Sequence, residues 1–261
     1  MEQHHLDSIT NITNKLQKDP DNLALLIGGS IAHGFAKSNS DVDIMIVISE
    51  ESYAKRLADN QLHYYETESC TYEGGYVDGK YITRQFMEQV AEKGSEPARF
   101  AFESARIAYS QLEDMPELLS RIVRYPVEEK QERIRKFMGQ LEAWNWYCYE
   151  AMKHDNTYLL NQAVSSLVLF GGRLILAHNE QLYPYHKWFL KVLEGVRSKP
   201  EGLMAKIDAL LQTPSRENVE AFYSSVRHFT DWGVEDFNWP VQFMYDTELP
   251  WMKGNSSVED L

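Results

Sequence analysis

Two carboxylates stand one residue apart at the head of an apolar stretch. Asp41 and Asp43 open the run DVDIMIVI (41–48), which is rich in β-branched residues. Residues two apart in a strand point to the same face, so the two side chains project together while Val42 and Ile44 face the other way. Two ionised carboxylates this close repel one another and are costly to bury unpaired. The pair predicts a bound cation. Oxygen ligands favour Mg²⁺ or Mn²⁺, and two such ions suit in-line phosphoryl displacement.

A glycine pair and a serine end the preceding apolar run, LALLIG (23–28). Glycine lets the backbone approach a phosphate closely, and the segment after Gly28 and Gly29 can begin a helix whose free N–H groups attract anions. Ser30 adds a hydroxyl donor. Gly29 and Gly34 have the spacing of a P-loop, but Phe35 follows directly where a P-loop has Lys-Ser or Lys-Thr, so the segment is not a P-loop. The pattern predicts a triphosphate cradle at Gly28, Gly29 and Ser30, one short segment before the metal ligands.

Hydrophobic periodicity and turn residues predict the strands and helices that position the two aspartates and the glycine loop. In the first 125 residues, strands are predicted at 23–28, 41–48, 62–67, 76–83 and 105–109, and helices at 5–18, 49–60 and 84–93. Ser49 precedes two acids and is a good N-cap for the second helix. The Gly74-Gly75 turn between the third and fourth strands favours a hairpin. These elements predict a small mixed sheet with helices.

The remainder of the chain reads as helices alone. Long helical patterns follow one another from about residue 126, broken at Pro184, Pro200 and Pro214. Strands followed by helices predict the α+β class. We expect a mixed-sheet domain over 1–125 and a helical bundle domain over 126–261. Aromatic residues in the helical half, such as Trp144 and Tyr147, lie at a spacing that favours bundle core over stacking on a ligand.

Charge and cysteine usage restrict the partners. Among the 261 residues, 39 are Asp or Glu and 26 are Lys or Arg, which gives a formal net charge of −13. Nucleic-acid binding proteins normally cluster Lys and Arg, so the balance argues against nucleic acid and favours a neutral or cationic small substrate. Cys70 and Cys148 lack metal-ligand spacing. With no secretory signal visible and no apolar run near the length of a membrane span, we expect a cytoplasmic protein without membrane contact.

The pattern Gly-Gly-Ser, ten residues, Asp-Val-Asp over residues 28–43 resembles the signature of the DNA polymerase beta-like nucleotidyltransferase superfamily. That signature also carries a glycine midway and a serine just before the first acid, which Gly34 and Ser40 match. The order of predicted strands and helices over roughly 1–110 resembles the same superfamily. The resemblance implies a Mg²⁺-dependent enzyme with two ions, or Mn²⁺ in their place, and ATP or another NTP as co-substrate.

The resemblance also implies a third carboxylate from a neighbouring strand. Asp78, after the turn that begins GGYVDGKYIT, is the preferred candidate, and Glu66, Glu68 and Glu73 are its rivals. Together with Asp41 and Asp43 it would complete the catalytic metal site. Ser40 is assigned with the glycine loop to nucleotide binding.

A segment of the helical half, GGRLILAHNEQLYPYHKWFLKVL, resembles the helical domains of small-molecule nucleotidyltransferases that act on antibiotics. In this resemblance Lys187 is a candidate contact to the triphosphate, with a surface lysine beside a helical core as the alternative. Lys37 is a second candidate for a phosphate contact.

The leading interpretation is therefore transfer of a nucleoside monophosphate, AMP from ATP in the first place, onto a hydroxyl of a small molecule. The aminoglycoside and lincosamide branch supplies the resemblance, and the acidic composition favours a cationic acceptor. The alternatives are template-independent nucleotide addition to RNA, adenylylation of a protein, and a catalytically silent nucleotide-binding module. A monomer and a homodimer are both compatible with the sequence.

Overall fold

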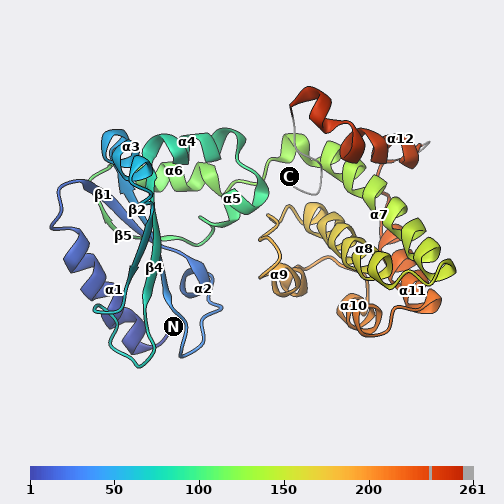
Figure 1. Ribbon diagram of the computed structural model, residues 1–261, viewed down its shortest axis with the longest axis horizontal. Helices are drawn as coiled ribbons and strands as arrows, with labels where there is room; N and C mark the ends of the chain where they lie inside the picture. The colour runs from blue at the N-terminus through green and yellow to red at the C-terminus, as the bar shows by residue number, and fades with distance from the viewer. Residues whose placement is uncertain (235–236, 255–261) are drawn as a thin grey trace. The chain divides into compact units, whose positions relative to one another are not determined.

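The structure, a computed structural model, describes residues 1–234 and 237–254. It divides into two compact units, Met1–Arg124 and Tyr125–Leu261. The helical domain predicted for 126–261 thus includes residues 235–236 and 255–261, which lie outside the described part. Each unit is described here by itself (Figure 1).

The first unit contains all the strands of the described chain. Its strands are β1 (Asn22–Ile27), β2 (Val42–Ile48), β3 (His63–Glu66), β4 (Val77–Thr83) and β5 (Arg106–Ser110). Its helices are α1 (Gln3–Leu16), α2 (Gly29–Ala32), α3 (Glu50–Ala58), α4 (Arg84–Lys93), α5 (Glu96–Phe100) and α6 (Met115–Ile122).

The five strands form one sheet in the order β3-β4-β2-β1-β5. β2 and β4 run parallel, whereas the other neighbouring pairs are antiparallel. The predicted α+β class, with a small mixed sheet followed by helices, is confirmed. The helix α3 and the edge strand β3 occupy the connection from β2 to β4, which allows two parallel strands to lie side by side.

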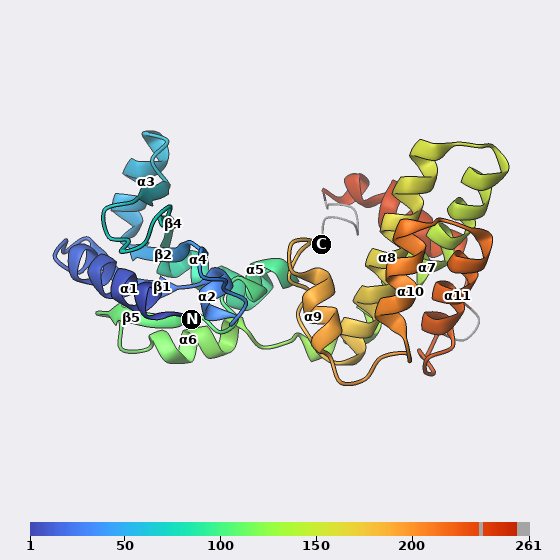
Figure 2. The ribbon, with the colours of Figure 1, turned by 90° about the horizontal axis from the view of Figure 1, so that it is seen from below.

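Helices cover both faces of this sheet. On one face, α1 contributes Ile12 and Leu16 to a core with Val42, Ile44 and Ile46 of β2. On the other face the core combines side chains of β1, β2 and β4 with those of α4 and α6: Leu26, Met45, Val47, Ile82, Met87, Val90, Leu118 and Ile122. Figure 2 shows α3 and α6 on opposite sides of the strands. The central strand β2 is apolar on both faces because both are covered.

Local sequence signals explain where the flanking helices begin. The Ser49 side chain accepts a hydrogen bond from the backbone N–H of Ser52, so the predicted cap of α3 is present. Thr83 caps α4 in the same way through the backbone N–H of Phe86. The caps therefore start α3 directly after β2 and α4 directly after β4, and they mark where the two strands end.

All the regular secondary structure in the described part of the second unit is helical. It contains a 3₁₀ turn at Val127–Glu129, α7 (Lys130–Lys153), α8 (Thr157–His178), α9 (Phe189–Gly195), α10 (Leu203–Gln212), α11 (Arg216–Arg227) and α12 (Trp239–Phe243). A π-helical turn at Met244–Glu248 and a 3₁₀ turn at Pro250–Lys253 follow. One apolar core joins α7 and α8 with α9, α10 and α11. The helical pattern expected directly after the break at Pro184 becomes a helix only at Phe189, after an irregular segment.

The expectation that no apolar run approaches the length of a membrane span is wrong for the helix α8. By length and composition alone, its 22 residues, Thr157–His178, could cross a membrane. Of its most apolar stretch, 67% is buried inside the protein. The helix is apolar nearly all round because it lies at the centre of the bundle, where neighbouring helices cover it.

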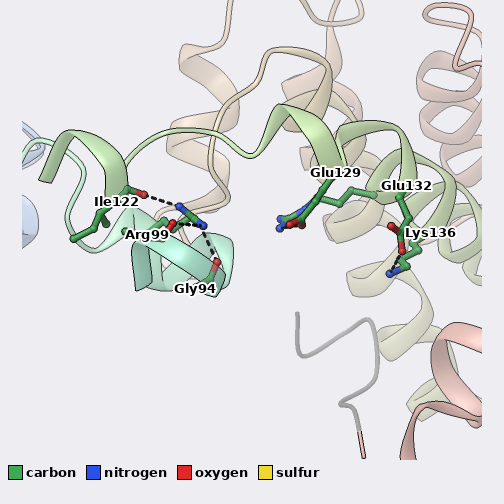
Figure 3. Close-up of polar contacts among 8 residues, drawn as sticks. Gly94, Arg99, Ile122, Glu129, Glu132 and Lys136 are labelled. Carbon is green, nitrogen blue, oxygen red and sulfur yellow. Dashed lines mark hydrogen bonds and ion pairs between the residues drawn. The ribbon is translucent and has the colours of Figure 1, made fainter. Parts of the chain in front are cut away.

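A buried arginine ties together three segments of the first unit (Figure 3). Arg99 is 6% exposed, and its guanidinium donates hydrogen bonds to the carbonyls of Gly94 (3.0 Å), Ala91 (3.1 Å) and Ile122 (3.1 Å). Arg99→Met should lower the local unfolding free energy of this unit by about 3 kcal/mol, because three carbonyls lose a charged donor. Hydrogen exchange of the α4 and α6 amides measures this free energy.

The matched control removes an ion pair on a helix surface, also drawn in Figure 3. Lys136 Nζ lies 2.8 Å from Glu132 Oε1 one turn away on α7. Partly exposed pairs of this kind contribute about 0.5 kcal/mol, so Lys136→Met should leave exchange in α7 nearly unchanged. Equal effects of the two substitutions would contradict the role assigned to Arg99.

Candidate active site

The parallel pairing of β2 and β4 brings three aspartates to one end of the sheet. Asp43 of β2 lies in register with Asp78 of β4, and Asp41 directly precedes β2. Oxygen atoms of all three carboxylates lie within 4.8 Å of one another. All three side chains are partly exposed, so the cluster is open to solvent and to a ligand. The three aspartates named from the sequence therefore lie together.

The chemistry of this donor set fits a divalent cation. Three carboxylates at such a separation repel one another, and a cation between them removes the repulsion. The set contains only oxygen donors, which suit Mg²⁺ and Mn²⁺ better than softer metals. The residues present can therefore hold the metal that the sequence led us to expect.

The rival acids lie in other surroundings. Glu66, at the end of β3, forms an ion pair with Lys15 of α1. Glu68 lies 3.1 Å from the same ammonium group. Glu73 is exposed in the turn before β4. Of the acids considered for the third position, Asp78 is the one that lies beside Asp41 and Asp43.

The glycine loop is in direct contact with the aspartate cluster. The backbone N–H of Gly28 donates to the carbonyl of Asp43 at 2.9 Å, and the short helix α2 begins at Gly29. Gly29 has a φ of +58°, and a Cβ atom at this position would lie 1.7 Å from Asp43 Oδ2. Such a separation is far inside van der Waals contact, so the Asp43 carboxylate occupies the space that a side chain at position 29 would need. Glycine is required here for two independent reasons.

The two serines assigned to nucleotide binding differ in their surroundings. The Ser30 hydroxyl is buried and has no hydrogen-bond partner in the described structure. A buried hydroxyl without a partner is costly, and a phosphate oxygen is a fitting acceptor for it. Ser40 Oγ instead accepts the backbone N–H of Lys37 at 2.9 Å, and the Ser40 carbonyl accepts the Tyr72 hydroxyl at 2.5 Å. These bonds close the loop that leads into Asp41.

An aromatic stack supports the loop after the glycines. The His33 ring stacks on Phe100 of α5 at 4.5 Å between ring centres, with 12° between the planes. The His33 ring also stacks with the Phe35 ring, at 5.7 Å between ring centres. Burial lowers the pKa of His33, and its ring packs against the two phenyl rings.

Three residues around the cluster were not identified from the sequence. His63 Nε2 lies 2.5 Å from Asp78 Oδ1. The charge of Asp41 and a hydrogen bond to it raise the pKa of the Tyr76 hydroxyl. Desolvation lowers the pKa of Lys80, while the charge of Asp43 opposes that shift. Lys80 follows Asp78 by two residues, so strand alternation could have placed its side chain on the same face as Asp78. The position of His63 could not be predicted in this way, because it depends on the β3–β4 register.

The second unit contains the remaining candidates. Lys187 is exposed, and its ammonium group lies 5.2 Å from the centre of the Trp188 ring. Its contact with a triphosphate stays a prediction. Trp144 is 9% exposed within the bundle core, and Tyr147 packs against the same core. The preference for core over ligand stacking at Trp144 and Tyr147 agrees with this packing.

Comparison with known proteins gives one family. The family described as "Nucleotidyltransferase domain" matches residues 8–170. A solved structure, that of a nucleotidyltransferase-like protein from Exiguobacterium sibiricum, is 11% identical in sequence with a TM-score of 0.48, and the alignment covers 95% of this chain and 81% of that one. No curated protein matches the chain. The family match extends over the aspartate cluster, the glycine loop and the helices α7 and most of α8.

Proposed function

Because the chain belongs to the nucleotidyltransferase domain family, we propose that it transfers a nucleoside monophosphate, AMP from ATP in the first place, onto a hydroxyl group of a small molecule. The cluster of Asp41, Asp43 and Asp78 beside the Gly28-Gly29 loop is the observation that carries this proposal. In the reaction the acceptor oxygen bonds to the α-phosphorus, the bond from that phosphorus to the β-phosphate bridge breaks, and pyrophosphate leaves.

Each residue of the site has a defined role in this reaction. Asp41 and Asp43 would hold the divalent metal ions, which would neutralise charge on the triphosphate. Asp78 completes this ligand set and accepts or relays the proton of the acceptor hydroxyl. Gly29 lets the backbone approach the phosphates, and Ser30 donates its hydroxyl to them. The rate enhancement then depends on positioning and on charge neutralisation, and no covalent intermediate with the protein is needed.

The acceptor we propose is small and cationic, such as an aminoglycoside. The chain carries a formal net charge of −13. A negative protein repels the phosphates of a long nucleic acid and attracts cations. The helical second unit is the proposed place for acceptor recognition.

The experiment that tests this proposal measures both products. The protein is incubated with Mg²⁺, each NTP in turn, and a panel of hydroxyl-bearing acceptors that includes aminoglycosides, lincosamides, tRNA and a protein extract. We expect pyrophosphate release to match the amount of a small acceptor whose mass has grown by one nucleoside monophosphate. Transfer to tRNA or to protein would contradict the proposed acceptor class. Nucleotide binding without turnover on any acceptor would contradict the proposed reaction.

Substitution of the buried Ser30 should affect nucleotide binding but not the stability of the protein. Ser30→Ala removes a hydroxyl that has no partner within the described protein, so it should not lower the free energy of unfolding without nucleotide. It should weaken NTP binding about tenfold if the hydroxyl donates to a phosphate, since a hydrogen bond to a charged group contributes about 1.5 kcal/mol or more. Nucleotide titration by calorimetry measures this affinity. Unchanged affinity would remove Ser30 from the phosphate site.

A further inference from the structure

The edge strand β3 places a histidine against one of the clustered carboxylates. His63 Nε2 lies 2.5 Å from Asp78 Oδ1. In the antiparallel pairing of β3 with β4, His63 lies opposite Lys80 and Tyr65 lies opposite Asp78. Diagonal neighbours on one face of such a pair are within reach of long side chains. The register of two strands therefore positions the imidazole, independently of any loop conformation.

We propose that His63 is a positioning residue that holds the Asp78 carboxylate in the orientation needed to bind a divalent metal ion. The inference rests on the proposed function, because it assumes the metal site of Asp41, Asp43 and Asp78. It adds to that site a residue of β3, a strand that contributes none of the three acids.

The hydrogen-bonding chemistry of the pair supports this role. An ionised carboxylate can only accept hydrogen bonds, so in this pair the imidazole Nε2–H is the donor and Asp78 Oδ1 is the acceptor. A hydrogen bond to one oxygen restricts rotation about the Cβ–Cγ bond, and thereby fixes the second oxygen as well. Without this bond, the negative charges of Asp41 and Asp43 favour turning Asp78 away. The Asp78 side chain is 42% exposed, so it has room to turn.

Outer partners of metal ligands have measurable effects. A hydrogen bond that orients a ligating side chain changes metal affinity or activity about 10–100-fold when it is removed. The His63 side chain is 69% exposed, so an exposed pair of this kind contributes little to folding. The effect of substitution at this position should therefore appear in metal binding and not in stability.

The test compares two substitutions at one position. His63→Leu removes the donor, whereas His63→Gln keeps an N–H at a similar distance from the backbone. Binding of Mn²⁺ alone is measured by electron paramagnetic resonance, which does not require turnover. We expect His63→Leu to weaken Mn²⁺ binding about tenfold or more, and His63→Gln to retain most of the affinity. The concentration of Mg²⁺ that gives half-maximal pyrophosphate release should rise in the Leu variant in parallel.

A second exposed histidine provides the control. His154 Nε2 lies 3.4 Å from Glu150 Oε2 on the surface of the second unit, and the His154 side chain is 64% exposed. His154→Leu makes the same chemical change to a similar pair and should leave Mn²⁺ affinity unchanged. Unchanged affinity in His63→Leu, or an equal loss in His63→Gln, would overturn the inference. Mn²⁺ binding that depends on His63 in a protein without turnover would support the inference and refute only the proposed function.

Discussion

Asp43→Asn is expected to lower Mg²⁺-dependent pyrophosphate release at least about a hundredfold, since a lost metal ligand removes several kcal/mol of transition-state stabilisation. The substitution keeps the size and shape of the side chain. It removes one negative charge from the group whose oxygen atoms lie within 4.8 Å of one another. Asp41→Asn should have an effect of the same kind. The rate of pyrophosphate release with the identified acceptor measures both.

The stability of the same variant provides the control for misfolding. In the absence of metal, the three carboxylates repel one another, so Asp43→Asn should leave the thermal unfolding temperature unchanged or raise it. With added Mg²⁺ the unchanged protein should gain stability, because a ligand that binds only the folded state stabilises it. The variant should gain little. Full turnover in either asparagine variant would refute the proposed two-metal site.

Gly29→Ala is expected to reduce turnover to a similar degree, although position 29 carries no functional side chain. The new Cβ would meet Asp43 Oδ2 at 1.7 Å, Cγ at 2.3 Å and Cβ at 2.6 Å. Because the whole Asp43 side chain lies in the way, rotation of its end cannot relieve the clash. Either Asp43 or the glycine loop must move, and both belong to the proposed site. The rate of pyrophosphate release measures the loss.

A control at a second glycine distinguishes the effect of the clash with Asp43 from the effect of backbone strain. Gly74, in the connection between β3 and β4, has a φ of +72°, and a Cβ there would meet nothing within 4 Å. Gly74→Ala should therefore show only the cost of a left-handed alanine, about 1–2 kcal/mol, and near-normal turnover. Gly29→Ala adds the clash with Asp43 to the same strain. Equal activity in the two alanine variants would contradict the contact between the loop and the metal site.

The first half of the site could be predicted because its signals are local. Asp41 and Asp43 lie on one strand, so the alternation of a strand placed them together. Gly28 and Gly29 preceded them by a short loop, and the start of α2 at Gly29 matches the expected helix. Strand alternation and a glycine loop depend only on residues nearby in the sequence, so they can be predicted without knowing the tertiary structure.

The remainder depends on pairing between distant strands. Asp78 could be preferred over Glu66, but its place beside Asp43 follows from the parallel register of β2 and β4, which alternation within one strand does not specify. His63 was out of reach for the same reason, because its contact requires the β3–β4 register. Tyr76 and Lys80 flank Asp78 and became recognisable only once that strand was placed.

In the helical half, the periodic patterns predicted the long helices more successfully than the short ones. The α7 and α8 patterns extend over 24 and 22 residues, which is long enough for periodicity to be decisive. The helical pattern was expected to resume directly after Pro184, yet Tyr185 has a φ of +65°, a left-handed conformation that a helix cannot contain. Phe189 and Leu193 are the buried residues of α9, and both belong to the bundle core.

The most direct test of the account is the binding of Mn²⁺ to the unchanged protein and to Asp43→Asn in the presence of a non-hydrolysable ATP analogue. This measurement needs no knowledge of the acceptor, and it examines the aspartate cluster itself. Our account predicts saturable binding of two ions per chain in the unchanged protein and loss of that binding in the variant. Absence of Mn²⁺ binding by the unchanged protein, or equal binding by both proteins, would contradict it.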